Sequence, residues 1–136
     1  MPRVLLAVPL VLAALVAGCG SGPSSASDFE GEEKEVAELV EKLETAGESR
    51  DAKTICTEIV AKELSDQITA AGSSCDAEME KAIEDAEDFT LDVEEVTITG
   101  DTATARVKGR DRGEDQVRTF EFEREGSGWR ATSLGA

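Results

Sequence analysis

Residues 91–107 read Leu-Asp-Val-Glu-Glu-Val-Thr-Ile-Thr-Gly-Asp-Thr-Ala-Thr-Ala-Arg-Val. Apolar and polar side chains alternate through this stretch with a period of two, which is typical of strands that bury one face. The phase of the alternation slips between Val93 and Val96, so we expect a β-bulge near Glu94–Glu95. Gly100-Asp101 supplies the turn between the two halves. The stretch therefore predicts a hairpin of two antiparallel strands.

Two more strands follow this hairpin. A third strand carries Val117, Phe120 and Phe122, with a second phase slip between the first two. Gly126-Ser127-Gly128 then connects it tightly to a last strand, from Trp129 to Leu134. Because the links between successive strands are short, we expect an antiparallel meander. One face of such a sheet packs on the core and the other faces water.

The chain before the hairpin shows the period of helices instead. Val36, Leu39, Val40 and Leu43 form the apolar stripe of a first helix, with Gly47 expected as its C-cap. A second helix begins near Asp51, and the apolar stripe that runs from residue 55 to residue 68 lies on it. A third helix begins after Ser74 and carries Cys75 on its buried face. Helices first and strands after predict an α+β domain of three N-terminal helices packed on a four-stranded antiparallel sheet.

Residues 1–18 have the pattern of a secretory signal. Arg3 precedes a run of thirteen apolar residues, Val4–Val16, and two small residues follow it. As a helix the run would rise only about 20 Å, which is too short for a bilayer core of about 30 Å.

The end of this segment, Leu15-Val16-Ala17-Gly18-Cys19, resembles the lipobox of bacterial lipoproteins. The resemblance implies cleavage before Cys19 and a diacylglycerol on its thiol. It also implies an extracytoplasmic protein that is lipid-anchored to the outer face of the cell membrane. An ordinary signal peptide that leaves a cysteine nearby is the alternative. On either interpretation residues 20–27, rich in Gly and Ser, form a flexible tether. We expect residues 19–28 to hold the lipidated cysteine and the tether, and residues 29–136 to form the single domain.

The charge of the chain restricts its partners. Its 14 Lys and Arg stand against 30 Asp and Glu, for a formal net charge of −16. Removal of residues 1–18 takes away the one positive charge of Arg3 and leaves −17. This excess disfavours nucleic acid as a partner, because nucleic-acid binding depends on basic patches. The membrane is expected to hold the protein through its lipid, and the folded domain is repelled from anionic lipids.

The cysteines that remain after Cys19 are Cys56 and Cys75. An exported compartment permits disulfides, and an even number of cysteines suggests a pair. A redox Cys-x-x-Cys motif is absent, and a metal site would need more Cys or His than the two cysteines provide. We expect a Cys56–Cys75 disulfide, and two buried free thiols are the alternative.

The order of elements resembles small exported members of the nuclear transport factor two-like, or cystatin-like, superfamily. The residues that carry the resemblance are an acidic first helix, Ile55-Cys56, Cys75, residues 97–105 and Trp129-Arg130. It implies a curved sheet around a cone-shaped pocket. Trp129, Phe120 and Phe122 are the candidate lining residues, although a residue at such an inward strand position is more often part of the core. Ketosteroid-isomerase-like relatives use an Asp base with Tyr. This chain has no Tyr and no obvious inward Asp, so that activity does not carry over.

Motifs for catalysis and for cofactors are absent from the sequence. There is no phosphate-binding loop, no serine elbow and, with no His in the chain, no His-based metal motif. Weak Ca²⁺ binding by the seven carboxylates between Glu84 and Glu95 is an alternative, but they lack the spacing of a dedicated loop and fit a solvated acidic face better. We therefore expect no catalytic residues, no metal and no cofactor.

The sequence leaves three functions open. The preferred one is a non-enzymatic module of the cell envelope that binds a small ligand or an envelope protein. The first alternative is a small enzyme in which the bulge turns Glu94 or Glu95 into the pocket, although we expect both side chains to stay in water. The second alternative is a regulatory partner of an envelope sensor or cell-wall system, which would expose an apolar patch on the sheet.

Overall fold

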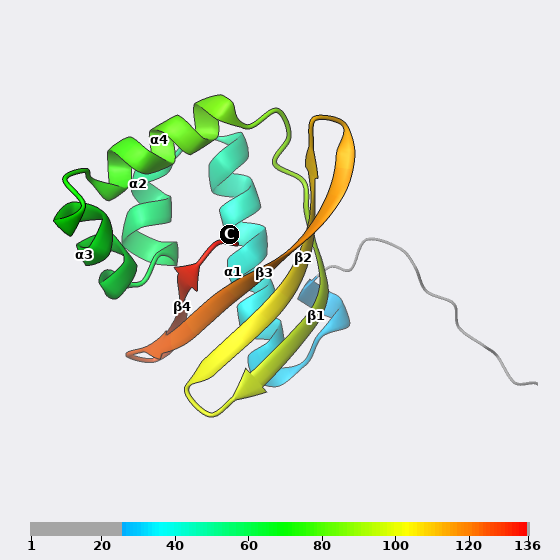
Figure 1. The fold of residues 1–136 in the computed structure, drawn as a ribbon. Coiled ribbons are helices and arrows are strands. Elements are labelled where there is room, and N and C mark those ends of the chain that lie inside the picture. Colours follow the sequence, from blue (N-terminus) through cyan, green and yellow to red (C-terminus); the bar gives the residue numbers. More distant parts are fainter. Residues whose placement is uncertain (1–25, 136) are drawn as a thin grey trace, which may run out of the picture.

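The computed structural model of the chain describes residues 26–135, so Cys19 and the predicted signal peptide lie outside the described residues. Within this range the helices precede the strands, which confirms the predicted α+β order. The helices pack on one face of a four-stranded antiparallel sheet, and Figure 1 shows the sheet twisted and bent around them.

The described chain contains six helical segments and four strands. The helical segments are η1 (Ala26–Asp28), α1 (Gly31–Glu48), α2 (Ala52–Thr54), the π-helical turn η2 (Ile55–Ile59), α3 (Lys62–Ala70) and α4 (Cys75–Asp85). The strands are β1 (Leu91–Thr99), β2 (Thr102–Asp111), β3 (Glu114–Glu125) and β4 (Gly128–Ser133).

Helix α1 buries the predicted stripe but ends differently from the prediction. Gly47 is not its C-cap, because it lies inside the helix and Ser49 caps it. The N–H groups of Arg50 and Asp51 close the last turn on the carbonyls of Gly47 and Ala46, with Arg50 at a φ of 56°. A glycine is needed at position 47 for another reason, since a Cβ there would overlap the ring of Phe89.

The prediction of a single second helix is wrong, because the segment is split into α2, η2 and α3. Val60 and Ala61, which lie between η2 and α3, are extended, with ψ angles of 134° and 147°. Val60 forms a parallel bridge with Ala131 of β4, and the Ala61 N–H donates to the Ala131 carbonyl at 2.8 Å. Both side chains are buried. The local pattern favours a continuous helix, but here hydrogen bonding to the edge strand β4 replaces the helical hydrogen bonds. Burial of the two side chains also favours this arrangement.

The sheet is the predicted meander, in the order β1-β2-β3-β4. Its register shifts between Val93 and Glu95, which confirms the β-bulge, and Gly100 turns the chain with a φ of 59°. The inner face packs on the helices. Its buried side chains are Val93, Val96, Ala103, Ala105, Val107, Phe120, Phe122, Trp129 and Ala131.

The predicted phase slip between Val117 and Phe120 is wrong. The β2–β3 register runs without a shift, and the shift in β3 lies between Glu121 and Phe122, opposite β4. Side chains of a strand alternate between its two faces, so Val117 points away from the face that Phe120 occupies. Val117 is accordingly 47% exposed.

The packed chain begins earlier than predicted. Ala26 is buried, and its N–H donates to Glu41 Oε1 of α1 at 2.6 Å. The folded domain therefore extends at least to Ala26, three residues before the predicted boundary at residue 29. Residues 20–25 of the predicted tether lie outside the described residues.

Candidate functional site

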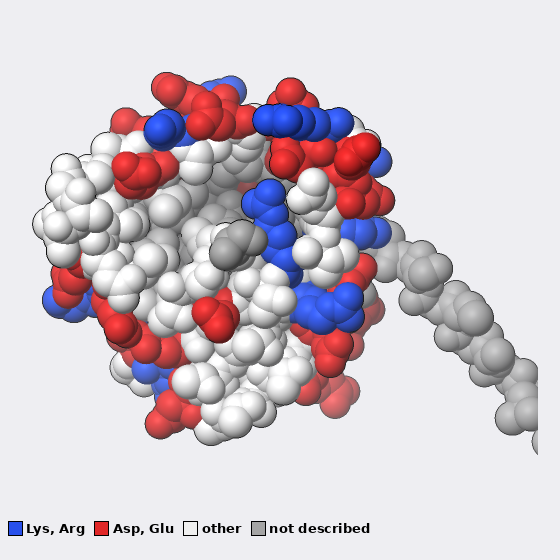
Figure 2. All heavy atoms as spheres, in the orientation of Figure 1, with Lys and Arg blue, Asp and Glu red and all other residues white. Residues whose placement is uncertain are grey.

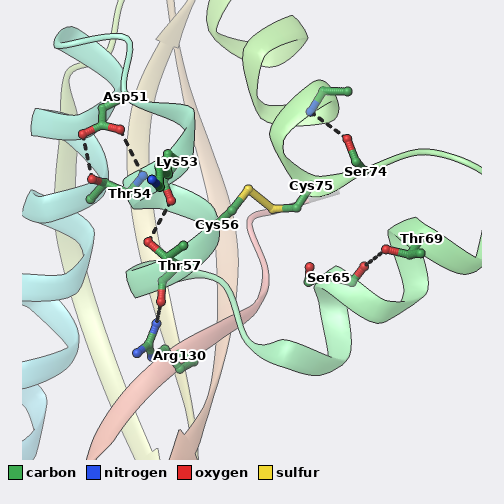
Figure 3. Close-up of a disulfide and its surroundings, with 11 residues drawn as sticks. Asp51, Lys53, Thr54, Cys56, Thr57, Ser65, Thr69, Ser74, Cys75 and Arg130 are labelled. Carbon is green, nitrogen blue, oxygen red and sulfur yellow. Dashed lines mark hydrogen bonds between the residues drawn. A yellow bond between two sulfur atoms is a disulfide. The ribbon is translucent and has the colours of Figure 1, made fainter.

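The Cys56–Cys75 disulfide is formed, which confirms the pairing and excludes two free thiols. It joins η2 to the first residue of α4, with 5.9 Å between the two Cα atoms. Figure 3 shows the bond between these two elements and the hydrogen bonds that surround it. Because η2 precedes the extended residues that pair with β4, the bond ties α4 to the sheet through this segment.

The neighbours of the disulfide are structural. Ser74 accepts a hydrogen bond from the Ala77 N–H and so caps α4 as predicted. Arg130 of β4 donates from Nη1 to the carbonyl of Thr57 at 2.7 Å. Asp51 accepts hydrogen bonds from the side chain and the backbone of Thr54, and these lower its pKa. The Asp51 and Ser74 interactions cap the starts of α2 and α4, and the Arg130 bond joins β4 to η2 (Figure 3).

Two of the three predicted lining residues are core residues. Trp129 and Phe122 are 4% and 3% exposed, belong to the core and do not line the hollow described below. Arg124 covers the Trp129 ring, with its guanidinium carbon 4.5 Å from the ring centroid. Phe120 is also buried, but it forms part of the wall of that hollow.

The hollow lies between the end of α4 and the long β2–β3 hairpin, on the face of the sheet that the helices cover. Its volume is about 320 Å³, at the lower end of the range of small-molecule sites. Its apolar lining residues are Leu91, the buried Val107 and Phe120, Ala82 of α4 and Ala86, the C-cap of α4. Figure 2 shows the molecule in the orientation of Figure 1, with acidic and basic side chains around a recess near its upper edge.

The rim of the hollow carries charges of both signs. Four carboxylates lie on it, and two guanidinium groups, Arg110 and Arg118, come from the hairpin. Each guanidinium has its own carboxylate. Arg118 pairs with Asp111 at 3.7 Å, and Arg110 pairs with Asp115 at 3.5 Å. The carboxylates of the rim are Asp85, Glu87, Asp88 and Asp111.

Asp88 is the rim carboxylate with the best-defined hydrogen bonds. Its Oδ1 accepts from the Thr90 N–H at 2.7 Å. The Thr90 side chain, the Thr90 backbone and the charge of Arg110 lower the pKa of Asp88, in this order of effect. The carboxyl group of Asp88 therefore takes up a proton only at a lower pH than an ordinary aspartate does.

Neither glutamate of the bulge points into the hollow. Glu94 and Glu95 are exposed, and they contact Arg106 at 3.6 and 3.7 Å. They stay in water, as expected. In residues 26–135 no three acidic or sulfur side chains are grouped closely enough to hold a metal ion.

The outer face of the sheet does not show the apolar patch that a protein-docking surface would need. Val117 is the only large apolar side chain that is exposed among the described residues. Its partner across the hairpin is Lys108. A single exposed apolar residue is ordinary on a soluble domain and indicates no interface.

The sequence pattern did not identify Gly109 and Arg118 as part of this site. Both follow from strand alternation, because Gly109 continues the inward series of Ala105 and Val107, and Arg118 shares the face of Phe120. On this inward face the apolar residues give way to Gly109 and then to charged residues. This change in the sequence could have indicated that the hairpin extends beyond the core.

Comparison with known proteins adds no assignment. No family model, curated protein or solved structure matches the chain. None of the helices within residues 26–135 combines the length and the apolar composition that crossing a bilayer requires.

Proposed function

We propose that this chain is a lipid-anchored, extracytoplasmic module of the bacterial cell envelope that binds a small ligand without chemical turnover. The ligand site is the hollow between the end of α4 and the β2–β3 hairpin. The observation that carries the proposal is a hollow of about 320 Å³ that reaches the core residues Val107 and Phe120 and is surrounded by charged side chains. Ligand sites commonly combine apolar walls with a few polar groups that orient the ligand.

The anchor rests on the sequence. The lipobox-like residues 15–19 are followed by six residues before Ala26, which is buried in the domain. Such a segment spans about 14 Å on average. The folded domain is therefore held next to the headgroups, and any ligand or partner must be available at that distance from the membrane.

The absence of turnover is supported by the state of the rim carboxylates. A general base that works near neutral pH needs a raised pKa, which burial usually provides. Asp88 shows the opposite, because its hydrogen bonds with Thr90 lower its pKa. No charged side chain in the described part of the chain is buried.

Kinship with the nuclear transport factor two-like, or cystatin-like, superfamily is part of the same proposal. Its support is the order of elements, helices before a four-stranded meander, and a recess on the face that the helices cover.

The anchor is tested by fractionation of cells that produce the wild-type chain or Cys19→Ala. We expect the wild-type protein in the membrane fraction, with a mass increase at its N-terminal peptide that corresponds to a diacylglycerol. The variant should lose both the added mass and the membrane location. Unchanged lipid labelling and location of the variant would contradict the anchor.

The site is tested by a variant that fills the hollow. A Cβ at Gly109 would lie 3.5 Å from Leu91 Cδ2 and 3.7 Å from the Thr90 carbonyl, which is ordinary contact, and Gly109 lines the hollow, so Gly109→Leu is designed to occupy it. Gly128→Ala is the control, because a Cβ there meets no atom within 4 Å and Gly128 is not part of the hollow.

We expect denaturation of the purified wild-type protein to release a small molecule that mass spectrometry detects. The same molecule should be released from Gly128→Ala and should be depleted from Gly109→Leu. Equal release from all three proteins would show that the hollow is not the site.

A further inference from the structure

We infer that the chain pairs with a second copy of itself through the free edge of β3, so that the two sheets join into one. The two copies of β3 lie antiparallel and are related by a two-fold axis. This inference does not depend on the proposed ligand. It rests on an unpaired strand edge, on the exposure of the hairpin that carries this edge, and on a sequence that is complementary to itself.

The first half of β3 has a neighbouring strand on one side only. Residues 114–119 pair with β2, whereas β4 pairs with β3 only from Glu121 to Glu125. Within residues 26–135 no backbone hydrogen bond joins residues 114–119 to an element other than β2. This edge therefore presents backbone N–H and C=O groups to a further strand. Main-chain hydrogen bonds hold an added strand, so such an edge needs no apolar patch.

The hairpin that carries this edge projects past the core. All residues from Glu114 to Thr119 are exposed, although the side chains of a strand alternate between its two faces. Figure 1 shows the tip of the hairpin beyond the end of β4. A two-stranded ribbon is marginally stable by itself, and a third strand stabilises it. A strand of a second copy supplies this support.

The other edges of the sheet are protected against pairing. Val60-Ala61 covers part of β4 through its bridge and hydrogen bond to Ala131. The bulge interrupts β1 and places Glu94 and Glu95 there, so two copies of β1 would bring like charges together. Bulges, charges and proline are common means of preventing edge pairing. Residues 114–119 contain no proline and no lysine, and their register with β2 has no bulge.

The sequence of the edge is complementary to itself. In an antiparallel pair centred on Val117, the two valine side chains meet on the outer face. Gln116 of each copy then lies opposite Arg118 of the other on the inner face, and Asp115 lies opposite Thr119. No like charges face each other directly in this arrangement.

Other registers are less favourable. A shift by one residue places inner-face side chains opposite outer-face ones. A centre at Arg118 brings the two guanidinium groups together and places Asp115 opposite Glu121. A centre at Gln116 avoids like charges but pairs only residues 114–118 of the strand, whereas a centre at Val117 pairs residues 114–120.

The mass of the mature protein in solution tests the interface. Sedimentation equilibrium in a neutral, density-matched detergent is measured from about 10 μM to about 1 mM protein. The buffer contains about 0.15 M NaCl, which screens the acidic charge. We expect the mass of the wild-type protein to rise to that of two chains. A mass of one chain at every concentration overturns the inference.

Two variants locate the contact. Val117→Lys places two ammonium groups opposite each other at the axis and should hold the mass at one chain. Thr104→Lys adds the same charge at an exposed position of β2, away from the free edge, and should behave as the wild type does. If Val117→Lys dimerises as strongly as the wild type, another surface or the shared micelle joins the chains, and the inference is wrong.

Hydrogen exchange tests the same edge without a substitution. Among residues 114–119, the backbone N–H groups that face away from β2 are open to water in one chain and hydrogen-bonded in the pair. Their exchange should slow as the concentration of the wild-type protein rises, while that of Ser127 in the β3–β4 turn stays constant. Exchange that is independent of concentration on this edge contradicts self-pairing. Protection that instead requires a co-purified protein of another sequence would show that the edge takes a foreign strand, which also overturns the inference.

Discussion

Arg124 is a side chain of β3 that links several elements of the described domain. Its guanidinium lies over the Trp129 ring, forms a hydrogen-bonded ion pair with Glu32 of α1 and contacts Asp101 at 3.6 Å. Its backbone N–H donates to the Asp101 carbonyl. One residue of β3 thus joins the first helix, the β1–β2 turn and the aromatic core residue of β4.

We predict that Arg124→Lys lowers the free energy of unfolding by about 1 kcal/mol, because a lysine keeps the charge but loses the planar contact with the indole ring. Urea unfolding followed by the fluorescence of Trp129, the single tryptophan, measures this change. Arg106→Lys is the control, since Arg106 forms only exposed ion pairs and should change stability little. Equal effects of the two substitutions would contradict the role of the stacking.

Asp88 carries a prediction about pH. Because its pKa is lower in the folded than in the unfolded chain, its stabilisation is present above the unfolded pKa and is lost as the pH falls through the folded pKa. An NMR titration of the Asp88 carboxyl group should give a midpoint below the usual aspartate range. Thr90→Val removes the hydroxyl and should raise the midpoint toward that range. An unchanged midpoint would show that the Thr90 side chain is not the cause.

At the scale of elements, local contacts were predictable and distant ones were not. The Ser74 cap and the 91–107 hairpin follow from neighbouring residues, and both were predicted from the pattern. The break at Val60-Ala61 depends on Ala131, and the glycine at position 47 depends on the Phe89 ring. No local periodicity contains these partners. The same reason explains the candidate site, in which Phe120 was predicted but Gly109 and Arg118 were not, because the hollow exists only where α4 meets the hairpin.

The disulfide provides the prediction at this scale. Cys56→Ala/Cys75→Ala should lower the free energy of unfolding by about 3 kcal/mol, because the bond closes a loop between residues nineteen positions apart. Urea unfolding of oxidised wild type, reduced wild type and the double variant measures it. The last two should agree. A reduced wild type as stable as the oxidised protein would contradict the prediction.

For the whole molecule, charge is the dominant property. The chain carries 14 positive and 30 negative side chains, and repulsion among the excess carboxylates opposes the compact state. We predict that raising NaCl from about 0.01 M to about 0.5 M increases the melting temperature, because the screening length falls from about 30 Å to a few ångströms. Calorimetry of the mature protein measures this. A melting temperature that falls with NaCl would show that the ion pairs outweigh the repulsion.

The measurement that tests the central claim most directly is a map of amide chemical shifts on the mature protein. The titrant is the small-molecule pool that the wild-type protein releases on denaturation. We predict shifts that saturate and centre on Leu91, Gly109 and Phe120, around the hollow. Shifts confined to Val117 and its neighbours on the outer face of the sheet would contradict the account, because the ligand would then bind on the opposite side of the sheet.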